Sequence, residues 1–238
     1  MPGLFTRKRL AAIVAAGGLL VFTAVFATQA TAPTSRADLQ PTRMQAKTAR
    51  NVVSLLDDLH YEHRKLDDAL SAQIFDRYLK DLDGQRLYFL ASDIQRFQPQ
   101  RVSFDNALKR GEMKGAFDIF NRYQQRARER LQFVIAEIDK GVTKMDFTVT
   151  DDMEINREKA AWATTPAALD ELWRKRIKAA ALSLRLAGKT DAEIQKTLGK
   201  RYRSQLNTMM RTKSDDAFQV FMNSFSETYD PHTEYFSP

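Results

Sequence analysis

Apolar residues recur every three or four positions along most of the chain after residue 45. This spacing predicts amphipathic helices, each with one side buried. The clearest stripe runs through Leu66, Leu70, Ile74, Tyr78 and Leu82 and predicts a helix over 66–82. The same reading places further helices near 46–60, 93–98, 103–110, 113–139, 166–187, 191–211 and 215–228. The fold class is therefore expected to be all-α, with a multi-helix domain over 45–228.

Residues typical of helix ends mark several of these boundaries. Thr165 followed by Pro166 is an N-cap with proline at the first helical position. Thr190 and Glu193 have the spacing of a capping box. The other expected boundary residues are Ser92 and Ser214 as N-caps and Gly84, Gly141 and Gly188 as C-terminal stops. Only 86–90 and 147–150 resemble strands, and no repeat of fixed period is present.

The first thirty residues have the layout of an export signal. Arg7, Lys8 and Arg9 precede an apolar run over 10–27, and small residues follow it. This order predicts a signal peptide over 1–30 that is cleaved after Ala30. The run is also just long enough to remain as an uncleaved membrane anchor. In either case the rest of the chain is expected outside the cytoplasm, with 31–44 as a linker.

Composition narrows the chemistry. The 238 residues contain no cysteine, which excludes disulfides, thiolate metal sites and a cysteine nucleophile. The formal net charge is +7. Without residues 1–30, which carry three bases and no acid, 34 basic and 30 acidic residues remain, a net +4. This small excess gives no reason to expect a nucleic-acid partner.

Three stretches resemble known sites but lack the required spacing. Gly188-Lys189-Thr190 lacks the first glycine of a phosphate-binding loop, because Ser183 occupies that position. His60, Glu62 and His63 match no zinc-peptidase motif, and a structural or surface role is expected for them. Residues 81–84 lack the later ligands of a calcium loop. No cofactor and no metal are expected.

Two other groups of side chains are of types that serve either structural or binding roles. Basic residues cluster at Arg122, Arg126 and Arg130, and again over 174–178. We expect solvated helix faces there, with an anionic partner as the alternative. Trp162 and Trp173 lie on either side of the helix start at Thr165. Core anchoring is expected for both rather than ligand stacking.

The last ten residues read as a loop that leaves a helix. Asp-Pro at 230–231 ends helical structure, because the residue before proline is excluded from the α region. Asp230 is expected to form an Asx-turn. His232 and Tyr235 would then contact a following domain, and we expect His232 to act in a hinge rather than in proton transfer. The candidate connector residues are Asp230, Pro231, His232, Thr233, Tyr235, Ser237 and Pro238.

Five segments together resemble the N-terminal region of the tail-specific proteases, which are periplasmic carboxy-terminal-processing serine peptidases. They are HYEHRKLDDALSAQIFDRYLKDLD (60–83), LASDIQRF (90–97), MDFTVTDD (145–152), LRLAGKTDAEI (184–194) and DPHTEYFSP (230–238). Phe236 departs mildly from the family, which usually has a Leu-like residue there. The resemblance implies a PDZ domain and a peptidase core with a Ser/Lys dyad downstream. No catalytic residue can be carried over to this chain, which is expected to be inactive alone.

Two functional hypotheses follow. In the first, the chain is a non-catalytic helical module of an exported endopeptidase that recognises substrate C-termini. Its partners would be the downstream PDZ and peptidase domains, periplasmic protein substrates and an envelope adaptor protein, with residues 229–238 as the connector. In the second, it is a stand-alone exported helical protein that binds an anionic envelope component. An open reading frame that continues into a PDZ-like sequence would eliminate the second hypothesis.

Overall fold

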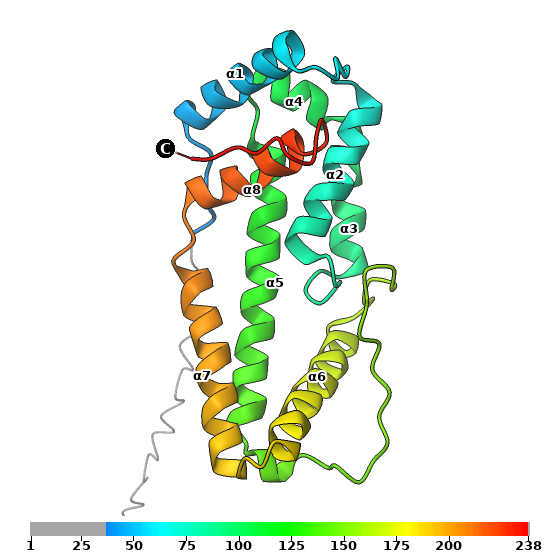
Figure 1. Cartoon of the computed structure of the whole chain (residues 1–238), viewed down its shortest axis with the longest axis vertical. Coiled ribbons are helices and arrows are strands. Elements are labelled where there is room, and N and C mark those ends of the chain that lie inside the picture. Colours follow the sequence, from blue (N-terminus) through cyan, green and yellow to red (C-terminus); the bar gives the residue numbers. More distant parts are fainter. Residues whose placement is uncertain (1–36, 238) are drawn as a thin grey trace, which may run out of the picture. The chain divides into compact units, whose positions relative to one another are not determined.

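The computed structural model describes residues 37–237, of which 38–237 belong to one compact unit. The predicted signal over 1–30, most of the expected linker and Pro238 lie outside the described residues. The described part is helical, with no strand (Figure 1). Its α-helices are α1 (Arg43–Leu59), α2 (Asp68–Asp83), α3 (Ala91–Phe97), α4 (Phe104–Arg110), α5 (Lys114–Asp139), α6 (Pro166–Leu186), α7 (Asp191–Met210) and α8 (Ser214–Ser226). Two short 3-10 helices, η1 (Gln98–Val102) and η2 (Val142–Lys144), complete it.

The long helix α5 belongs to two hydrophobic cores. Its first half packs with α1, α2, α4 and α8 in one core, here called the upper core, where the Phe221 ring packs edge to face with Tyr78 and with Phe104. Its second half packs with α6 and α7 in the lower core, around Trp173 and Leu198. The apolar stripe of α5 is continuous along its 26 residues, so one helix supplies a face to both cores.

The segment between α2 and α3 joins the two cores. Leu87 lies in the lower core and Phe89 in the upper one. The sequence suggested strands over 86–90 and 147–150, and both are wrong. The first segment instead bonds its N–H groups to the Asp83 carboxylate and makes one isolated parallel bridge, Leu90 to Ala163. With no neighbouring strand in the described part, a side chain at the end of α2 takes the place of a sheet ladder.

The expected tryptophan roles are confirmed. Trp173 is 3% exposed, and its Nε1 donates to the Leu87 carbonyl at 2.8 Å. Trp162 is partly buried against Phe89 with ring centroids 6.0 Å apart. Both rings therefore stabilise the joint between the cores, and each uses its large apolar area to do so.

The helix ends agree with the sequence except at two N-caps. Thr165 caps α6, and the capping box of Thr190 and Glu193 opens α7, as predicted. Ser92 and Ser214 are not N-caps. The N-cap residues are Leu90 and Lys213, whose N–H groups donate to the Asp93 and Asp216 carboxylates in the first turns of α3 and α8. A longer acidic side chain at the third helical position can reach back to the cap residue, so the serine is not needed.

We predict that Thr190→Ala lowers the free energy of unfolding by about 1 kcal/mol. The Thr190 side chain accepts from the Glu193 N–H at 3.3 Å, and the Glu193 carboxylate accepts from the Thr190 N–H at 2.9 Å. Thr197→Ala, an exposed position in the middle of the same helix, is the matched control. Urea unfolding of both variants tests this, and equal losses would contradict the capping role.

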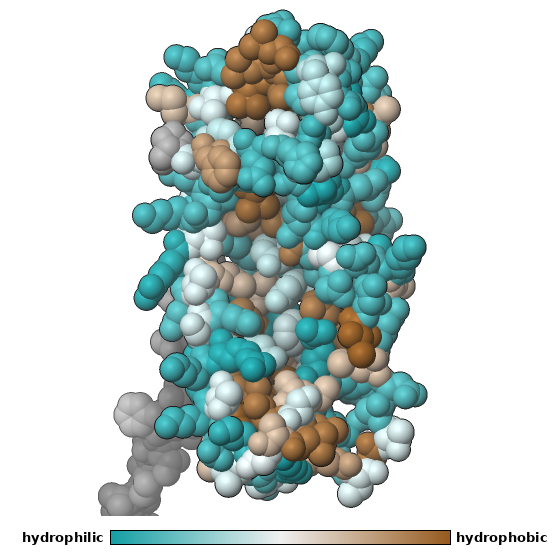
Figure 2. Space-filling view, in the orientation of Figure 1, coloured by the Kyte–Doolittle hydropathy of each residue, from teal (hydrophilic) through white to brown (hydrophobic). Residues whose placement is uncertain are grey.

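The surface of the unit is mostly polar, and α1 carries three of its exposed apolar side chains. Figure 2 shows hydrophobic residues at the end of the unit where α1 lies, and Met44, Leu55 and Leu59 of α1 are all more than half exposed. None of the helices described within 37–237 combines the length and the apolar character that a membrane crossing requires.

Candidate functional site

The closing segment, residues 229–237, folds back onto the helical unit. Asp230 Oδ1 accepts the His232 N–H at 2.6 Å, and the Thr233 N–H donates to the Asp230 carbonyl at 3.0 Å. These two bonds form the predicted Asx-turn directly after α8. The turn directs the rest of the segment back along α8 (Figure 1).

One side of the closing segment contacts the turn between α1 and α2. The Tyr61 hydroxyl donates to the Asp230 carboxylate. The His60 ring stacks on Tyr61 at 4.8 Å and meets the edge of Tyr229 at 5.3 Å. Its Nε2 lies 3.4 Å from Thr233 Oγ1. His60 thus has a structural role, as the sequence suggested, and it joins two segments that are 173 positions apart in the chain.

This contact favours the ionised form of Asp230. The hydrogen bonds from the Tyr61 hydroxyl and from the His232 N–H lower the pKa of Asp230 below its ordinary value. The same Tyr61–Asp230 bond raises the pKa of Tyr61. At neutral pH the pair is therefore a neutral phenol donating to a carboxylate.

The other side of the closing segment is fixed to α8. The Tyr235 N–H donates to Asn223 Oδ1 at 2.6 Å, and the Ser237 N–H donates to Gln219 Oε1 at 3.3 Å. The Tyr235 ring lies edge-on to Phe218, with centroids 5.4 Å apart. Tyr235 thus packs on its own domain through Phe218, and its expected contact with a following domain stays a prediction.

Two candidate residues of the closing segment and the neighbouring Phe236 face solvent. Pro231 and His232 are exposed, and Phe236 is 72% exposed. Sequence reasoning missed the residues that hold the segment, Tyr61, Gln219 and Asn223. A signal was present only for α8, where two amide side chains lie four positions apart on one helix face.

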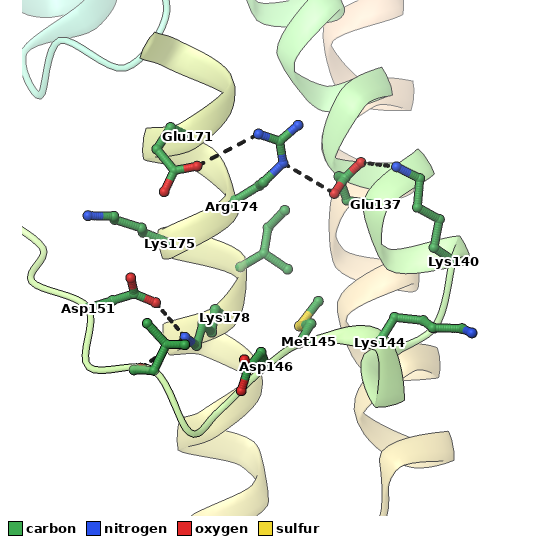
Figure 3. Close-up of a pocket in the computed structure, with 13 residues that line it drawn as sticks. Glu137, Lys140, Lys144, Met145, Asp146, Asp151, Glu171, Arg174, Lys175 and Lys178 are labelled. Carbon is green, nitrogen blue, oxygen red and sulfur yellow. Dashed lines mark hydrogen bonds and ion pairs between the residues drawn. The ribbon is translucent and has the colours of Figure 1, made fainter. Parts of the chain in front are cut away.

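A pocket lies beside η2, between α5 and α6. Its cavity of about 420 Å³ has a partly apolar wall that includes Met145, Val149 and Ile177. Figure 3 shows charged side chains of both helices around it. Arg174 lies between Glu137 and Glu171, and Lys178 pairs with Asp151. Charges of both signs line this pocket and largely neutralise one another, so it lacks the excess of one sign that would select an ionic ligand.

The basic clusters named from the sequence are mostly paired within the fold. Arg122 and Arg126 bind the Asp93 carboxylate, and Arg130 binds Asp170. In the 174–178 cluster, Arg174 and Lys178 form ion pairs, and the Arg176 guanidinium lies 5.5 Å from the Trp173 ring centroid. The expected solvated face is therefore wrong for Arg130, which is buried, and these arginines hold α3 and α6 against α5.

Comparison with known proteins identifies the family of this fold. The family model for the tail specific protease N-terminal domain matches residues 52–238. The chain is also 38% identical over 190 residues to the tail-specific protease of Haemophilus influenzae. That match covers 79% of this chain but only 27% of the relative. The chain belongs to the tail-specific protease N-terminal domain family.

Proposed function

We propose that this chain is the N-terminal helical domain of an exported serine endopeptidase that recognises substrate C-termini and degrades or processes periplasmic proteins. The domain acts as a non-catalytic scaffold beside the substrate cavity and as a surface for an envelope adaptor. The family match carries the proposal, because the relative is a protease and this chain corresponds to 27% of it. The Ser/Lys dyad would lie in the part of the protease beyond this domain.

The geometry of the closing segment supports the scaffold role. Contacts with the α1–α2 turn and with α8 hold residues 229–237 in one path. A connector held at several points transmits the orientation of the helical domain to whatever follows it, whereas a free linker does not.

The two buried serines Ser71 and Ser224 have structural roles. The Ser71 hydroxyl accepts the Phe104 N–H, and the Ser224 hydroxyl donates to Asp81.

A peptidase assay tests the proposal. The chain alone is expected to leave an unstructured protein substrate intact, and a full-length tail-specific protease that contains this domain is expected to cleave it. Cleavage by the chain alone that a serine-directed inhibitor abolishes would contradict the scaffold role.

Sequencing the N-terminus of the protein from the periplasmic fraction tests export, with Thr31 expected as the first residue. An intact N-terminus in the membrane fraction would indicate the uncleaved anchor instead.

We predict that His232→Ala changes kcat of the full-length protease by less than about twofold. The His232 side chain is exposed and makes no hydrogen bond or ion pair within residues 37–237, and only its backbone N–H is bonded, to Asp230. A steady-state assay on a substrate with a free C-terminus checks this. Unchanged KM with a large loss of kcat would instead assign proton transfer to His232.

The structure does not favour the alternative, a stand-alone protein that binds an anionic envelope component. Arg122, Arg126 and Arg130, the residues that first suggested it, are bound to carboxylates of the same domain. A cation that is already paired contributes little to binding an external anion, because the existing pair must first be broken.

A further inference from the structure

A groove that none of the roles above uses lies between α5 and α7. Its cavity of about 590 Å³ is lined on one side by Tyr88, Phe120 and Tyr123. On the other side α7 contributes Arg201, Gln205 and Thr208. The Tyr88 and Tyr123 rings meet edge to face at 5.5 Å, which fixes an aromatic wall. The groove therefore pairs an aromatic surface with a polar, cationic rim.

One lining residue has an unused hydrogen-bond donor. Gln124 Nε2 is buried and has no acceptor within residues 37–237. A buried amide N–H without a partner costs about 1–3 kcal/mol. A carbonyl or carboxylate oxygen in the groove would remove this cost. The vacant donor thus indicates that an occupant supplies an acceptor.

The rim on α7 has an unbalanced positive charge. From Ile194 to Lys213 inclusive, the chain has six basic residues and no acidic one. Within the part that the structure describes, only Arg203 of these six forms an ion pair, with Asp139. Arg201 lines the groove, is exposed and has no carboxylate partner among the described residues. The Arg201 guanidinium at the groove rim is therefore open to an external anion.

We propose that the α5–α7 groove binds an extended acidic polypeptide segment that carries one bulky apolar side chain. The aromatic wall takes the apolar side chain, and Gln124 donates to a backbone carbonyl of the segment. Arg201 pairs with a carboxylate of the segment. A peptide fits these features better than a lipid surface does, because a planar membrane cannot enter a concave groove whose wall includes hydrogen-bonding groups. Binding needs only α5, α7 and the loop at Tyr88, so it is independent of any peptidase activity.

Fluorescence anisotropy of a labelled peptide, Glu-Asp-Glu-Phe-Asp-Glu-Asp, with the complete chain tests the proposal. The peptide is expected to bind, and more weakly as salt is raised. Arg201→Ala should weaken binding by about fivefold or more, because it removes the rim cation. Lys196→Ala is the matched control on the same helix, at an exposed position outside the groove lining, and should change binding by less than about twofold.

Two further variants separate a specific groove from general charge attraction. Gln124→Met should weaken binding while leaving thermal stability unchanged or raised, because the lost donor is unpaired in the free chain. A peptide with alanine in place of its phenylalanine should also bind more weakly. Equal losses for Lys196→Ala and Arg201→Ala, equal binding of both peptides, or no binding at millimolar peptide would each overturn the proposal. So would Arg201-dependent binding to phosphatidylglycerol vesicles without binding to the peptide.

Discussion

Asp93→Ala is expected to lower the free energy of unfolding by about 3 kcal/mol. The Asp93 carboxylate is 2% exposed and lies 2.6 Å from Arg122 Nε and 2.8 Å from Arg126 Nε. It also accepts the Leu90 N–H at 3.0 Å, which caps α3. Removing the carboxylate leaves two arginines on α5 and one backbone donor without their acceptor. Breaking one side of a buried pair costs more than the pair contributes, because the remaining charge stays desolvated.

Urea unfolding of Asp93→Ala and of a surface control measures this effect. Asp118→Ala breaks an exposed ion pair with Lys114 on the same long helix and should cost less than about 1 kcal/mol. Equal losses in the two variants would show that the Asp93 pairs act only as surface charges. A double-mutant cycle with Arg126→Ala isolates the pairwise part of the loss.

The same site predicts how stability depends on pH. Burial raises the pKa of Asp93, but the hydrogen bonds from Arg126, the Leu90 N–H and Arg122 together outweigh it, so the pKa in the folded state is lowered. A lowered pKa means that the contribution is complete above the ordinary aspartate pKa of about 4 and is lost as the pH falls through the folded value. The wild-type chain should therefore lose more stability than Asp93→Asn between pH 5 and pH 3. Parallel pH profiles would contradict this assignment.

Asp83→Ala is expected to cost a similar amount, about 3 kcal/mol, by a different mechanism. Asp83 is 3% exposed and accepts the N–H groups of Leu87, Tyr88 and Phe89 at 2.7, 2.9 and 2.9 Å. Alanine leaves three backbone donors unpaired at the joint between the two cores. Without these bonds the backbone at Leu87 is no longer fixed. Its carbonyl accepts the Trp173 Nε1–H, so the substitution should also weaken packing in the lower core.

Chemical denaturation and hydrogen exchange together test the role of Asp83. Exchange at residues 87–89 should become faster in Asp83→Ala, and Asp83→Asn should lie between the alanine variant and the wild type, because its one oxygen keeps part of the acceptor set. Asp76→Ala, which removes an exposed partner of Arg101 on the same helix, is the matched control. Unchanged exchange at 87–89 in Asp83→Ala would exclude the anchoring role.

Short-range patterns in the sequence correctly predicted those features whose hydrogen bonds join neighbouring residues. The capping box at Thr190 and Glu193, the Thr165-Pro166 start and the Asx-turn at Asp230 are all correct, because each depends on side chains within three residues. Local reasoning failed at Ser92 and Ser214, which lie inside the first turn, because the helices begin after Leu90 and Lys213, whose N–H groups are bound by Asp93 and Asp216. It failed again at 86–90, whose hydrogen bonds go to a side chain rather than to a strand.

The sequence by itself determined the helical class, most helix ends and the family. The helical class follows from the spacing of apolar residues. The helix ends follow from capping side chains within one turn, and the family follows from short motifs that can be read along the chain. Only the tertiary structure decided which charges are used internally. Arg126 and Arg201 look alike in the sequence, yet one binds the buried Asp93 and the other is exposed at the rim of a groove. The reason is that an ion pair depends on distance across the fold, and the residues that meet there are more than thirty positions apart in the chain.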